Sequence, residues 1–383
     1  MTRRILFYVQ HLMGVGHVFR AMRIVRALVD AGHTVDLIHG GLPIPNFDAA
    51  GAMVHLLPPL KAGTSVFNDL EDGDGKPAGD DYKARRRDML LTVFEAGGHD
   101  ALITEAFPFG RRQMRFELMP LLEAAKRRAK PPVVIASVRD ILQENRKPGR
   151  DRETVATLKT HFDHVLVHGD PDFAGLDLTF PLYTEIVDMV RHTGIVAPEP
   201  PMPPASASER FDVVVSVGGG ALGRELLFAA AGAKPLSKLA DARWCIVTGL
   251  GFAEKDRVAL ESALTGDVEL CTFLPDLASA MAAAELSISR CGYNTTADIF
   301  ATGCRAIVVP LADGTETEQL RRAELLDRKG YAARLDPAEQ TPAKLATAID
   351  RAMERQRTAP PPVDLGGAAE TARLVSQILA ERP

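Results

Sequence analysis

The segment ILFYVQHLMGVGHVFRAMRIVRALVDAGHTVDLIHG, residues 5–40, decides the fold class of this chain. Its first run, Ile5 to Gln10, is rich in β-branched and aromatic residues, which is typical of a buried parallel strand. Apolar residues at helical spacing predict a helix from Val15 to Ala31, and Thr34 to Gly40 has the pattern of the next strand. This order is a βαβ unit, which builds a parallel sheet. We expect the basic residues of the helix to lie toward another face than the apolar ones; they are Arg20, Arg23 and Arg26.

Similar apolar runs continue along the chain, with charged helical stretches between them. They are Ala101 to Thr104, Val133 to Ser137, His164 to His168, Asp212 to Val217, Trp244 to Thr248, Leu286 to Ser289 and Ala306 to Val309. Between the third and fourth runs, five prolines from Pro198 to Pro204 form a semi-rigid connector. The pattern predicts an α/β protein in which two doubly wound, Rossmann-like domains face a central cleft.

The domain boundaries follow from the connector. We expect an N-terminal domain over residues 1–197, a linker over 198–210, and a second domain over 211–383 whose last helix can pack back on the first domain. The length of 383 residues fits two or three units of roughly 150 residues. The acidic, glycine-rich stretch 63–79 has little periodicity, so we expect a mobile loop there.

Composition narrows the class of function. The chain has 46% hydrophobic and 25% charged residues, as a folded globular protein does. Its 45 basic and 50 acidic residues give a net charge of −5, which argues against a dedicated nucleic-acid binder. The four cysteines form no CxxC pair, so we expect free thiols and a cytoplasmic location. The apolar stretch at the N-terminus is much shorter than the roughly 18 residues that span a bilayer.

The sequence GGGALG, from Gly218 to Gly223, matches a phosphate-binding turn. It follows a strand and precedes a helix, where close-lying backbone N–H groups and the helix dipole favour an anionic diphosphate. The alternative is a tight turn without a ligand. A nicotinamide cofactor would require an acidic residue at the end of the second strand. Asp241 precedes that strand, which weakens the interpretation of the protein as a dehydrogenase.

His17 stands at the start of the first helix, after Gly16. A helix N-terminus disfavours the charged imidazolium, so a neutral His17 can act as a general base. The alternative is a structural histidine whose nitrogens bind backbone groups. Glu105 and Asp140 are further candidate bases, because each follows a strand whose carboxyl end points into the crevice.

A third element extends from Ser289 to Pro310. Asn294 or Thr295 can cap its helix, and Gly303 can end it. Asp298 then lies in the first turns, where its carboxylate can accept hydrogen bonds from the hydroxyls of a ribose. An aspartate that only stabilises the helix dipole is the alternative.

The motifs GVGHVFR, GGG, FLPDLASAMAAAELSISRCGYNTTADI and DGTETEQLRRAELLDRKG follow one another in this order. This order resembles the GT-B glycosyltransferases, most closely the MurG-type transferases that add N-acetylglucosamine to a lipid-linked acceptor. It resembles the UDP-glycosyltransferases and a group of predicted bacterial glycosyltransferases more loosely. The likeness covers most of the chain and is strongest from Leu270 to Gly330. The chain departs from the MurG type at Gly220 and Ala221, which replace a Ser-Gln pair, and at Ile195, which stands where that family carries Asn-Pro.

The resemblance implies a role for each candidate site residue. His17 would lie at the reaction centre, and Asp298 would bind the ribose. The resemblance also implies that the first domain lies on the acceptor side and that the second binds the donor. The other donor-binding candidates are Gly218, Gly219 and Gly220 for the diphosphate, Phe273 and Leu274 for the base, Asn294 and Thr295 at the helix start, Glu318 and Gln319 for the donor sugar, and Gly16. The expected reaction is inverting transfer from a UDP- or dTDP-sugar to an unidentified hydroxyl, without metal or cofactor.

Two further segments are candidates for a metal site and for an acceptor contact. Asp72-Gly73-Asp74 is formally a DxD motif, but it lies in the acidic stretch, so a solvated charge run is favoured over a metal site. FPFGRRQMR, from Phe107 to Arg115, combines aromatic residues with three arginines. It could meet an anionic or lipid-linked acceptor, or simply begin a solvated amphipathic helix.

Other functions remain open on the sequence alone. A nucleotide-sugar epimerase can share the two-domain fold, and an NAD(P)-dependent oxidoreductase could use GGGALG. A non-catalytic nucleotide-sugar sensor would keep the glycines and Asp298. The expected partners are a nucleotide sugar and a small-molecule or lipid-linked acceptor, with a peripheral membrane contact left open and no nucleic acid.

Overall fold

The computed structural model describes residues 2–12, 14, 16–44, 47–63, 70–145, 147–202, 210–219, 223–311, 316–355 and 360–382. The chain divides into two compact units. The N-unit comprises Met1–Val196 together with Gly366–Pro383, and the C-unit comprises Ala197–Leu365.

In its described part, the N-unit contains a seven-stranded parallel sheet with the order β3-β2-β1-β6-β7-β8-β9. The strands are β1 (Arg4–Val9), β2 (Thr34–His39), β3 (Met53–Leu56), β6 (Ala101–Glu105), β7 (Val133–Arg139), β8 (His164–His168) and β9 (Val190–His192). All five strands predicted for this half of the chain are confirmed. The short strands β3 and β9 lie at the two edges, and β3 exposes Met53 and Leu56, so neither carries the apolar run of a buried strand.

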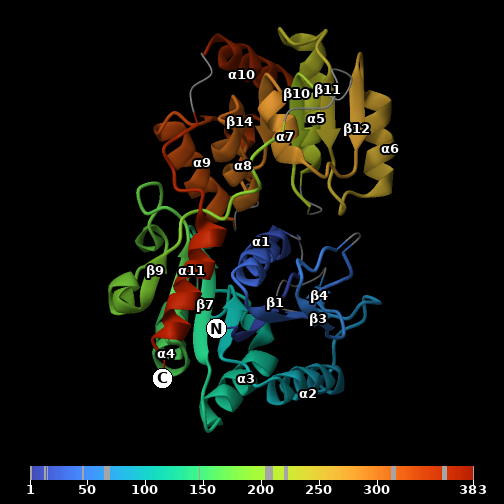
Figure 1. Ribbon diagram of the computed structural model, residues 1–383. Helices are drawn as coiled ribbons and strands as arrows, with labels where there is room; N and C mark the ends of the chain where they lie inside the picture. The colour runs from blue at the N-terminus through green and yellow to red at the C-terminus, as the bar shows by residue number, and fades with distance from the viewer. Residues whose placement is uncertain are drawn as a thin grey trace. The chain divides into compact units, whose positions relative to one another are not determined.

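Helices cover the sheet of the N-unit. They are α1 (Gly16–Asp30), α2 (Asp80–Gly97), α3 (Arg115–Arg127), α4 (Arg150–His161) and α11 (Gly367–Ala380), with 3-10 turns at η1 (Arg112–Met114), η2 (Leu176–Leu178), η3 (Tyr183–Glu185) and η4 (Val187–Met189). The last helix, α11, packs beside α1 although it lies at the other end of the chain (Figure 1). Gly367 permits this return, because a Cβ atom there would lie 2.5 Å from the Gly194 carbonyl oxygen.

The stretch 63–79 contains structure where we expected only a loop. Lys61–Ala62 (β4) and Leu70–Glu71 (β5) pair as an antiparallel ribbon. Asp72 organises the turn that follows, because its Oδ1 accepts hydrogen bonds from the N–H groups of Asp74 and Lys76, both at 2.9 Å. The DxD sequence is therefore a turn, and the residues 64–69 lie outside the described part.

In its described part, the C-unit contains a six-stranded parallel sheet with the order β12-β11-β10-β13-β14-β15. The strands are β10 (Val213–Ser216), β11 (Trp244–Val247), β12 (Val268–Cys271), β13 (Leu286–Ser289), β14 (Ala306–Val308) and β15 (Ala333–Arg334). The four strands predicted here are confirmed. The helices are α5 (Arg224–Ala233), α6 (Glu254–Ala263), α7 (Leu277–Ala283), α8 (Tyr293–Thr302), α9 (Glu318–Arg328) and α10 (Pro342–Glu354), with 3-10 turns at η6 (Lys234–Leu236) and η7 (Pro337–Glu339).

The start of α8 differs from the prediction. Gly292 is its N-cap, with an extended backbone, and the helix begins at Tyr293. Asn294 and Thr295 therefore lie inside the first turn and do not cap the helix. The predicted end is confirmed, because Gly303 adopts the left-handed conformation (φ 56°) that favours glycine.

Both sheets reverse their strand order next to the first strand of the unit. The reversal lies between β1 and β6 in the N-unit and between β10 and β13 in the C-unit. At such a switch point the connections leave in opposite directions and open a crevice beyond the carboxyl ends of the two strands. A ligand site is therefore expected at each of these two places.

Candidate active site

In the N-unit, the switch point brings together a histidine and a carboxylate. His17 lies in the first turn of α1, which follows β1, and Glu105 ends β6. The Nδ1 atom of His17 lies 3.4 Å from Oε1 of Glu105. The His17 side chain is 16% exposed, whereas that of Glu105 is 1% exposed. The pair thus combines a buried carboxylate with an imidazole that solvent and ligands can reach.

Arg20 fixes the position of Glu105. It lies one helical turn after His17 and forms a buried ion pair with Glu105 Oε1. Its guanidinium group also lies 3.2 Å from His17 Nδ1. Arg20 is buried although it is basic, because Glu105 compensates its charge inside the protein.

The second oxygen of Glu105 continues the polar network into the core. Ser137 Oγ donates to Glu105 Oε2 at 2.6 Å and lies 2.8 Å from His168 Nε2. His168 Nδ1 lies 3.0 Å from the hydroxyl of Thr193. These contacts occupy both Glu105 oxygens, so Glu105 is held in one orientation.

The charges of this network determine which groups are ionised. Burial, and then the positive charge of Arg111, hold the pKa of His17 well below its usual value. Burial lowers the pKa of His168 to about 3, so that histidine is neutral at pH 7. Burial alone would raise the pKa of Glu105, but Arg20 and His17 hold it below its usual range. At neutral pH the site therefore pairs a neutral imidazole with a carboxylate.

Asp140 and Gly16 are the other N-unit candidates. Asp140 is buried after β7, its Oδ1 accepts a hydrogen bond from the N–H of Ile141 at 2.7 Å, and its Cβ packs against Gly169. Gly16 is the first residue of α1.

In the C-unit, the glycine turn lies at the carboxyl end of β10. Gly218 has a left-handed backbone (φ 79°), and its carbonyl oxygen would lie 2.1 Å from a Cβ atom at Gly249. Gly223 precedes α5 and packs against Val217, where a Cβ atom would lie 2.4 Å from the valine Cβ. These glycines let the turn approach the neighbouring loop and let α5 approach the strand. Gly219 lies in the same turn, whereas Gly220 is outside the described residues.

The segment after β13 lies beside this turn. β10 and β13 are neighbours, with Ser216 opposite Ser289. The hydroxyls of both serines and Nε of Arg290 are buried and have no hydrogen-bond partner among the described residues. Buried polar atoms of this kind usually have a partner, so the crevice has unused hydrogen-bonding capacity. Asp298, which is 6% exposed, lies further along α8 in the same crossover.

The remaining donor-binding candidates frame the same end of the sheet. Phe273 is exposed and Leu274 half-buried in the loop after β12. Glu318 is buried and pairs with Arg322 at 2.8 Å. Gln319 Oε1 accepts hydrogen bonds from the N–H groups of Cys291 and Leu311, at 3.1 and 3.2 Å. The Nε2 amide of Gln319 has no partner among the described residues and remains able to donate.

Sequence reasoning missed several residues of these networks. The spacing of Arg20, three residues after His17, was a usable signal, because such residues lie on one helix face. Ser137 lies opposite Glu105 in the register of β6 and β7, and Arg290 directly follows β13, as Glu105 ends β6. Polar residues at the ends of apolar strands could therefore have been added to the candidate site residues.

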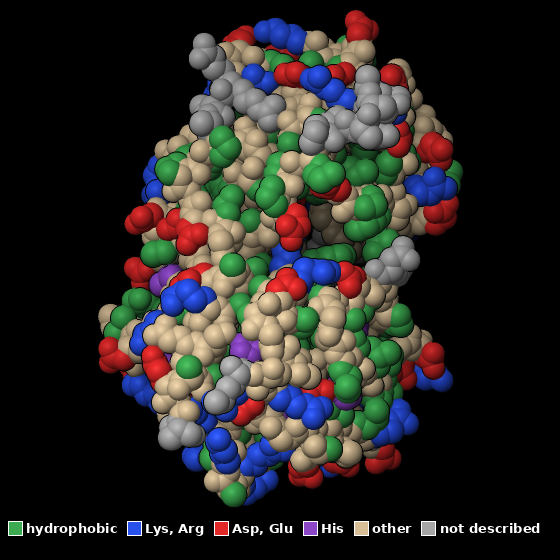
Figure 2. All heavy atoms as spheres, viewed as in Figure 1, with side chains coloured by type: hydrophobic (Ala, Val, Ile, Leu, Met, Phe, Trp, Pro, Cys, Tyr) green, Lys and Arg blue, Asp and Glu red, His purple; other side chains and the backbone are tan. Residues whose placement is uncertain are grey.

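The described residues offer neither a metal cluster nor a membrane-spanning helix. Across the described ranges, no group of three or more His, Cys, Asp or Glu side chains is arranged to hold a metal ion. No helix in the described part of the chain is both long and apolar enough to cross a membrane. Basic and acidic side chains are interspersed on the face shown in Figure 2, in line with the near balance of 45 basic and 50 acidic residues.

Comparison with known proteins gives both family and fold. Residues 214–373 match the glycosyltransferase family 28 C-terminal domain. The UDP-N-acetylglucosamine--N-acetylmuramyl-(pentapeptide) pyrophosphoryl-undecaprenol N-acetylglucosamine transferase of Solibacter usitatus is 30% identical over 257 residues, covering 64% of this chain and 67% of that protein. The protein of the same name from Acidiphilium cryptum is 41% identical, but the match spans only 22% of this chain and 23% of that protein.

Solved structures share the fold over the full length. The calicheamicin glycosyltransferase CalG4 matches with a TM-score of 0.64 and 16% identity, covering 100% of both chains. MurG of Acinetobacter baumannii matches with a TM-score of 0.60 and 16% identity, covering 98% of this chain and 99% of that one. Both neighbours are glycosyltransferases, and the GT-B fold expected from the sequence is confirmed.

Proposed function

Since the chain belongs to the family of MurG-like glycosyltransferases, we propose that it transfers a sugar from a nucleotide-sugar donor, UDP- or dTDP-linked, to an acceptor hydroxyl. The observation that carries the proposal is the His17–Glu105 pair at the N-unit switch point. The nucleotide sugar is a co-substrate, and the proposed reaction uses no metal and no cofactor.

His17 is the proposed general base. With its proton on Nδ1, directed to Glu105, its Nε2 atom is free to accept the proton of the acceptor hydroxyl. The acceptor oxygen then bonds to the anomeric carbon of the donor. The bond from that carbon to the diphosphate oxygen breaks, and the nucleoside diphosphate leaves with the electron pair. Attack from the side opposite the leaving group inverts the anomeric centre.

Glu105 is the proposed positioning residue. Its negative charge stabilises the imidazolium that forms when His17 takes the proton. The proposed role requires the tautomer in which His17 Nδ1 carries the proton and donates to Glu105, and not the one in which Nδ1 accepts from Arg20. Since Arg20 and Ser137 hold Glu105, it does not need to reorient during the reaction.

The C-unit switch point is the proposed donor site. Backbone N–H groups of the glycine turn at Gly218 and Gly219, with the N-terminus of α5, would stabilise the departing diphosphate. The unused polar atoms of Ser216, Ser289 and Arg290 support a polar ligand at this place. The proposed contacts are Asp298 with the ribose, Phe273 and Leu274 with the base, and Gln319 Nε2 with the sugar, while Glu318, held by Arg322, supports the loop.

The proposed acceptor is a small molecule or a lipid-linked molecule. A peripheral membrane contact would serve the second case. We place the reaction in the cytoplasm because all four cysteines are free thiols, which a reducing compartment preserves. Fractionation of cells that express the tagged chain tests this location.

Three other functions make different predictions. An oxidoreductase would need an acid at the carboxyl end of the second strand of its dinucleotide domain, but β11 ends in Val247 and Asp241 lies before its amino end. An epimerase would convert the donor without an acceptor. A sensor would bind the donor without turnover.

The deciding experiment separates binding from transfer. The full chain is screened against UDP- and dTDP-sugars by thermal shift, because a specific ligand stabilises the folded state. Donors that bind are incubated with and without a panel of acceptors, and nucleoside diphosphate release and product mass are measured. Acceptor-dependent release supports the proposal. Epimerised donor without acceptor, nicotinamide-dependent redox change, or binding with no turnover each contradicts it in favour of a named alternative.

A further inference from the structure

Three arginines of the segment FPFGRRQMR have different environments. Arg112 and Arg115 both form ion pairs with Glu153 of α4. Arg111 has no acidic partner among the described residues, and its one hydrogen bond is the one from Nε to the Gln10 carbonyl oxygen, at 2.9 Å. Within the described part of the chain, no hydrogen bond or ion pair engages the two terminal nitrogens of Arg111.

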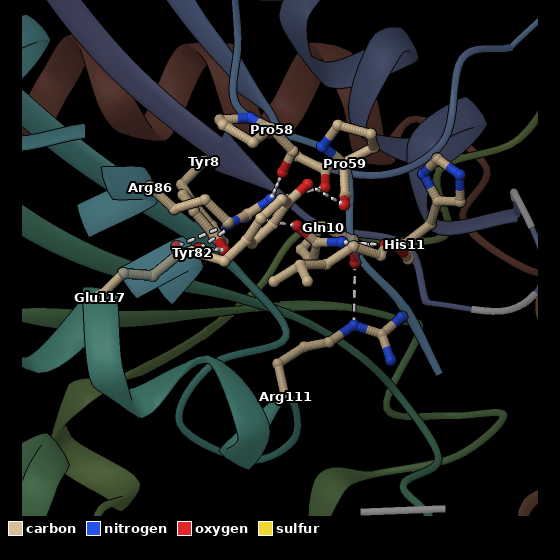
Figure 3. A network of polar contacts seen from close by, with 11 residues as sticks. Tyr8, Gln10, His11, Pro58, Pro59, Tyr82, Arg86, Arg111 and Glu117 are labelled. Carbon is tan, nitrogen blue, oxygen red and sulfur yellow. Dashed lines mark hydrogen bonds and ion pairs between the residues drawn. The ribbon is translucent and has the colours of Figure 1, made fainter. Parts of the chain in front are cut away.

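The backbone and one bond hold Arg111 in place. The residue adopts a left-handed backbone (φ 56°), which a non-glycine residue rarely does outside constrained or functional positions. Its Nε bond to Gln10 directs the rest of the guanidinium group away from the Arg86 network, as Figure 3 shows. The outer part of the group is thus presented in a fixed orientation.

The support beneath Arg111 is itself rigid. Gln10 donates from Nε2 to the carbonyl oxygens of His11 and Leu60, and its Oε1 accepts from Arg86 at 3.0 Å. Arg86 is fully buried and binds both carboxylate oxygens of Glu117, at 2.8 and 2.9 Å (Figure 3). Because this network is internally satisfied, it holds the Gln10 carbonyl without neutralising Arg111.

Positive charge accumulates around Arg111. Burial and the nearby charge of Arg139 lower the pKa of Arg111 to about 10, and Arg20 contributes in the same direction. Glu105 is a carboxylate whose charge acts on Arg111 in the opposite direction, but it is already paired with Arg20. Arg111 also lies close enough to His17 to lower the pKa of that histidine. An anion at this position would relieve the repulsion beside the proposed base.

We propose that Arg111 binds an oxyanion, a phosphate or a carboxylate, carried by the acceptor next to its reacting hydroxyl. The planar guanidinium fork suits two oxygens of such a group. The identity of the ligand as the acceptor rests on the proposed function, whereas the anion site itself does not. Arg112 is the matched control, since it is the adjacent arginine and Glu153 already occupies it.

The test measures anion binding to the full chain by calorimetry. Inorganic phosphate and acetate are each titrated in the presence of saturating UDP, which occupies any diphosphate site of the C-unit. We expect Arg111→Gln to weaken binding at least tenfold, Arg111→Lys to restore part of it, and Arg112→Gln to change nothing. If phosphate binds more tightly than acetate, the acceptor carries a phosphate. If acetate binds more tightly than phosphate, the acceptor carries a carboxylate. Equal binding by the wild type and Arg111→Gln, or no binding of either anion to the wild type, overturns the proposal.

A second measurement covers a variant that fails to fold. The wild-type chain is modified with phenylglyoxal, with and without phosphate or acetate, and modification at each arginine is measured by peptide mass spectrometry. Protection at Arg111 supports the site, and its absence overturns it. If Arg111-dependent anion binding is found but no sugar transfer occurs, the proposed function has failed and the anion site stands.

Discussion

The Nδ1 atom of His17 lies 3.4 Å from Oε1 of Glu105, although the two residues are 88 positions apart in the chain. The pairing arises because β1 and β6 are neighbours, so the loop after one strand meets the end of the other. An imidazole directed by a buried carboxylate can accept a proton on its outer nitrogen. This relationship makes the proposed mechanism testable.

Replacing Glu105 by Gln removes the negative charge while keeping the shape. We expect kcat to fall by about 10- to 100-fold, because the imidazolium loses its counter-charge. Arg20 also loses its buried partner, so the free energy of unfolding falls by about 3 to 5 kcal/mol. Steady-state kinetics and urea denaturation measure the two effects. Asp241→Asn, at an exposed site, is the control, and an unchanged kcat in Glu105→Gln would remove Glu105 from the mechanism.

The pH dependence of kcat/KM reports the ionisation of His17. Because burial and Arg111 lower its pKa, the neutral base persists below pH 6.5, and activity is lost only as the pH falls through the lowered pKa. Removing the positive charge in Arg111→Gln raises that pKa, so the acid limb moves to higher pH. Arg112→Gln leaves the limb in place. A wild-type limb at or above pH 6.5 argues against His17 as the base.

Asp298 tests the donor site. We expect Asp298→Ala to weaken nucleotide binding by about 10- to 100-fold, the effect of losing hydrogen bonds to a charged group. Calorimetry with UDP and dTDP measures the affinity, and kcat at saturating donor should change less. Thr302 Oγ1 donates to the Asp298 carbonyl oxygen, so the backbone contact survives the substitution. Nucleotide affinity equal to that of the wild type would exclude Asp298 from the site.

Gly223 tests whether close packing of α5 forms the phosphate turn. In Gly223→Ala, the new Cβ would lie 2.4 Å from the Cβ of Val217, and the helix must move. We expect a loss of about 1 to 3 kcal/mol of stability and weaker diphosphate binding. Adding Val217→Ala should restore part of both. Gly79→Ala is the control, because a Cβ there meets nothing within 4 Å. If Gly223→Ala binds nucleotide as tightly as the wild type, the packing of α5 at Gly223 is not needed for diphosphate binding.

The sequence alone predicted the two-sheet α/β architecture. The period and length of an apolar run can be read from neighbouring residues in the sequence. A strand that is buried on both faces needs a continuous run of mostly apolar residues, such as the one in Val213–Ser216. Edge strands such as β3 were missed because half-exposed strands carry no such run. The glycine turn and the end of α8 at Gly303 were also predicted, since a left-handed backbone favours glycine.

Only the tertiary structure decided which polar residues meet. The sequence could suggest His17 and Glu105 separately, but their pairing depends on the strand order β1-β6, and the burial of Arg20 depends on Glu105. The same holds for the two neighbouring arginines. Glu153 of α4 pairs with Arg112, whereas Arg111 donates to the Gln10 carbonyl oxygen. Pairing of charges across distant segments has no periodic signal in the sequence, because it is fixed by how whole elements pack.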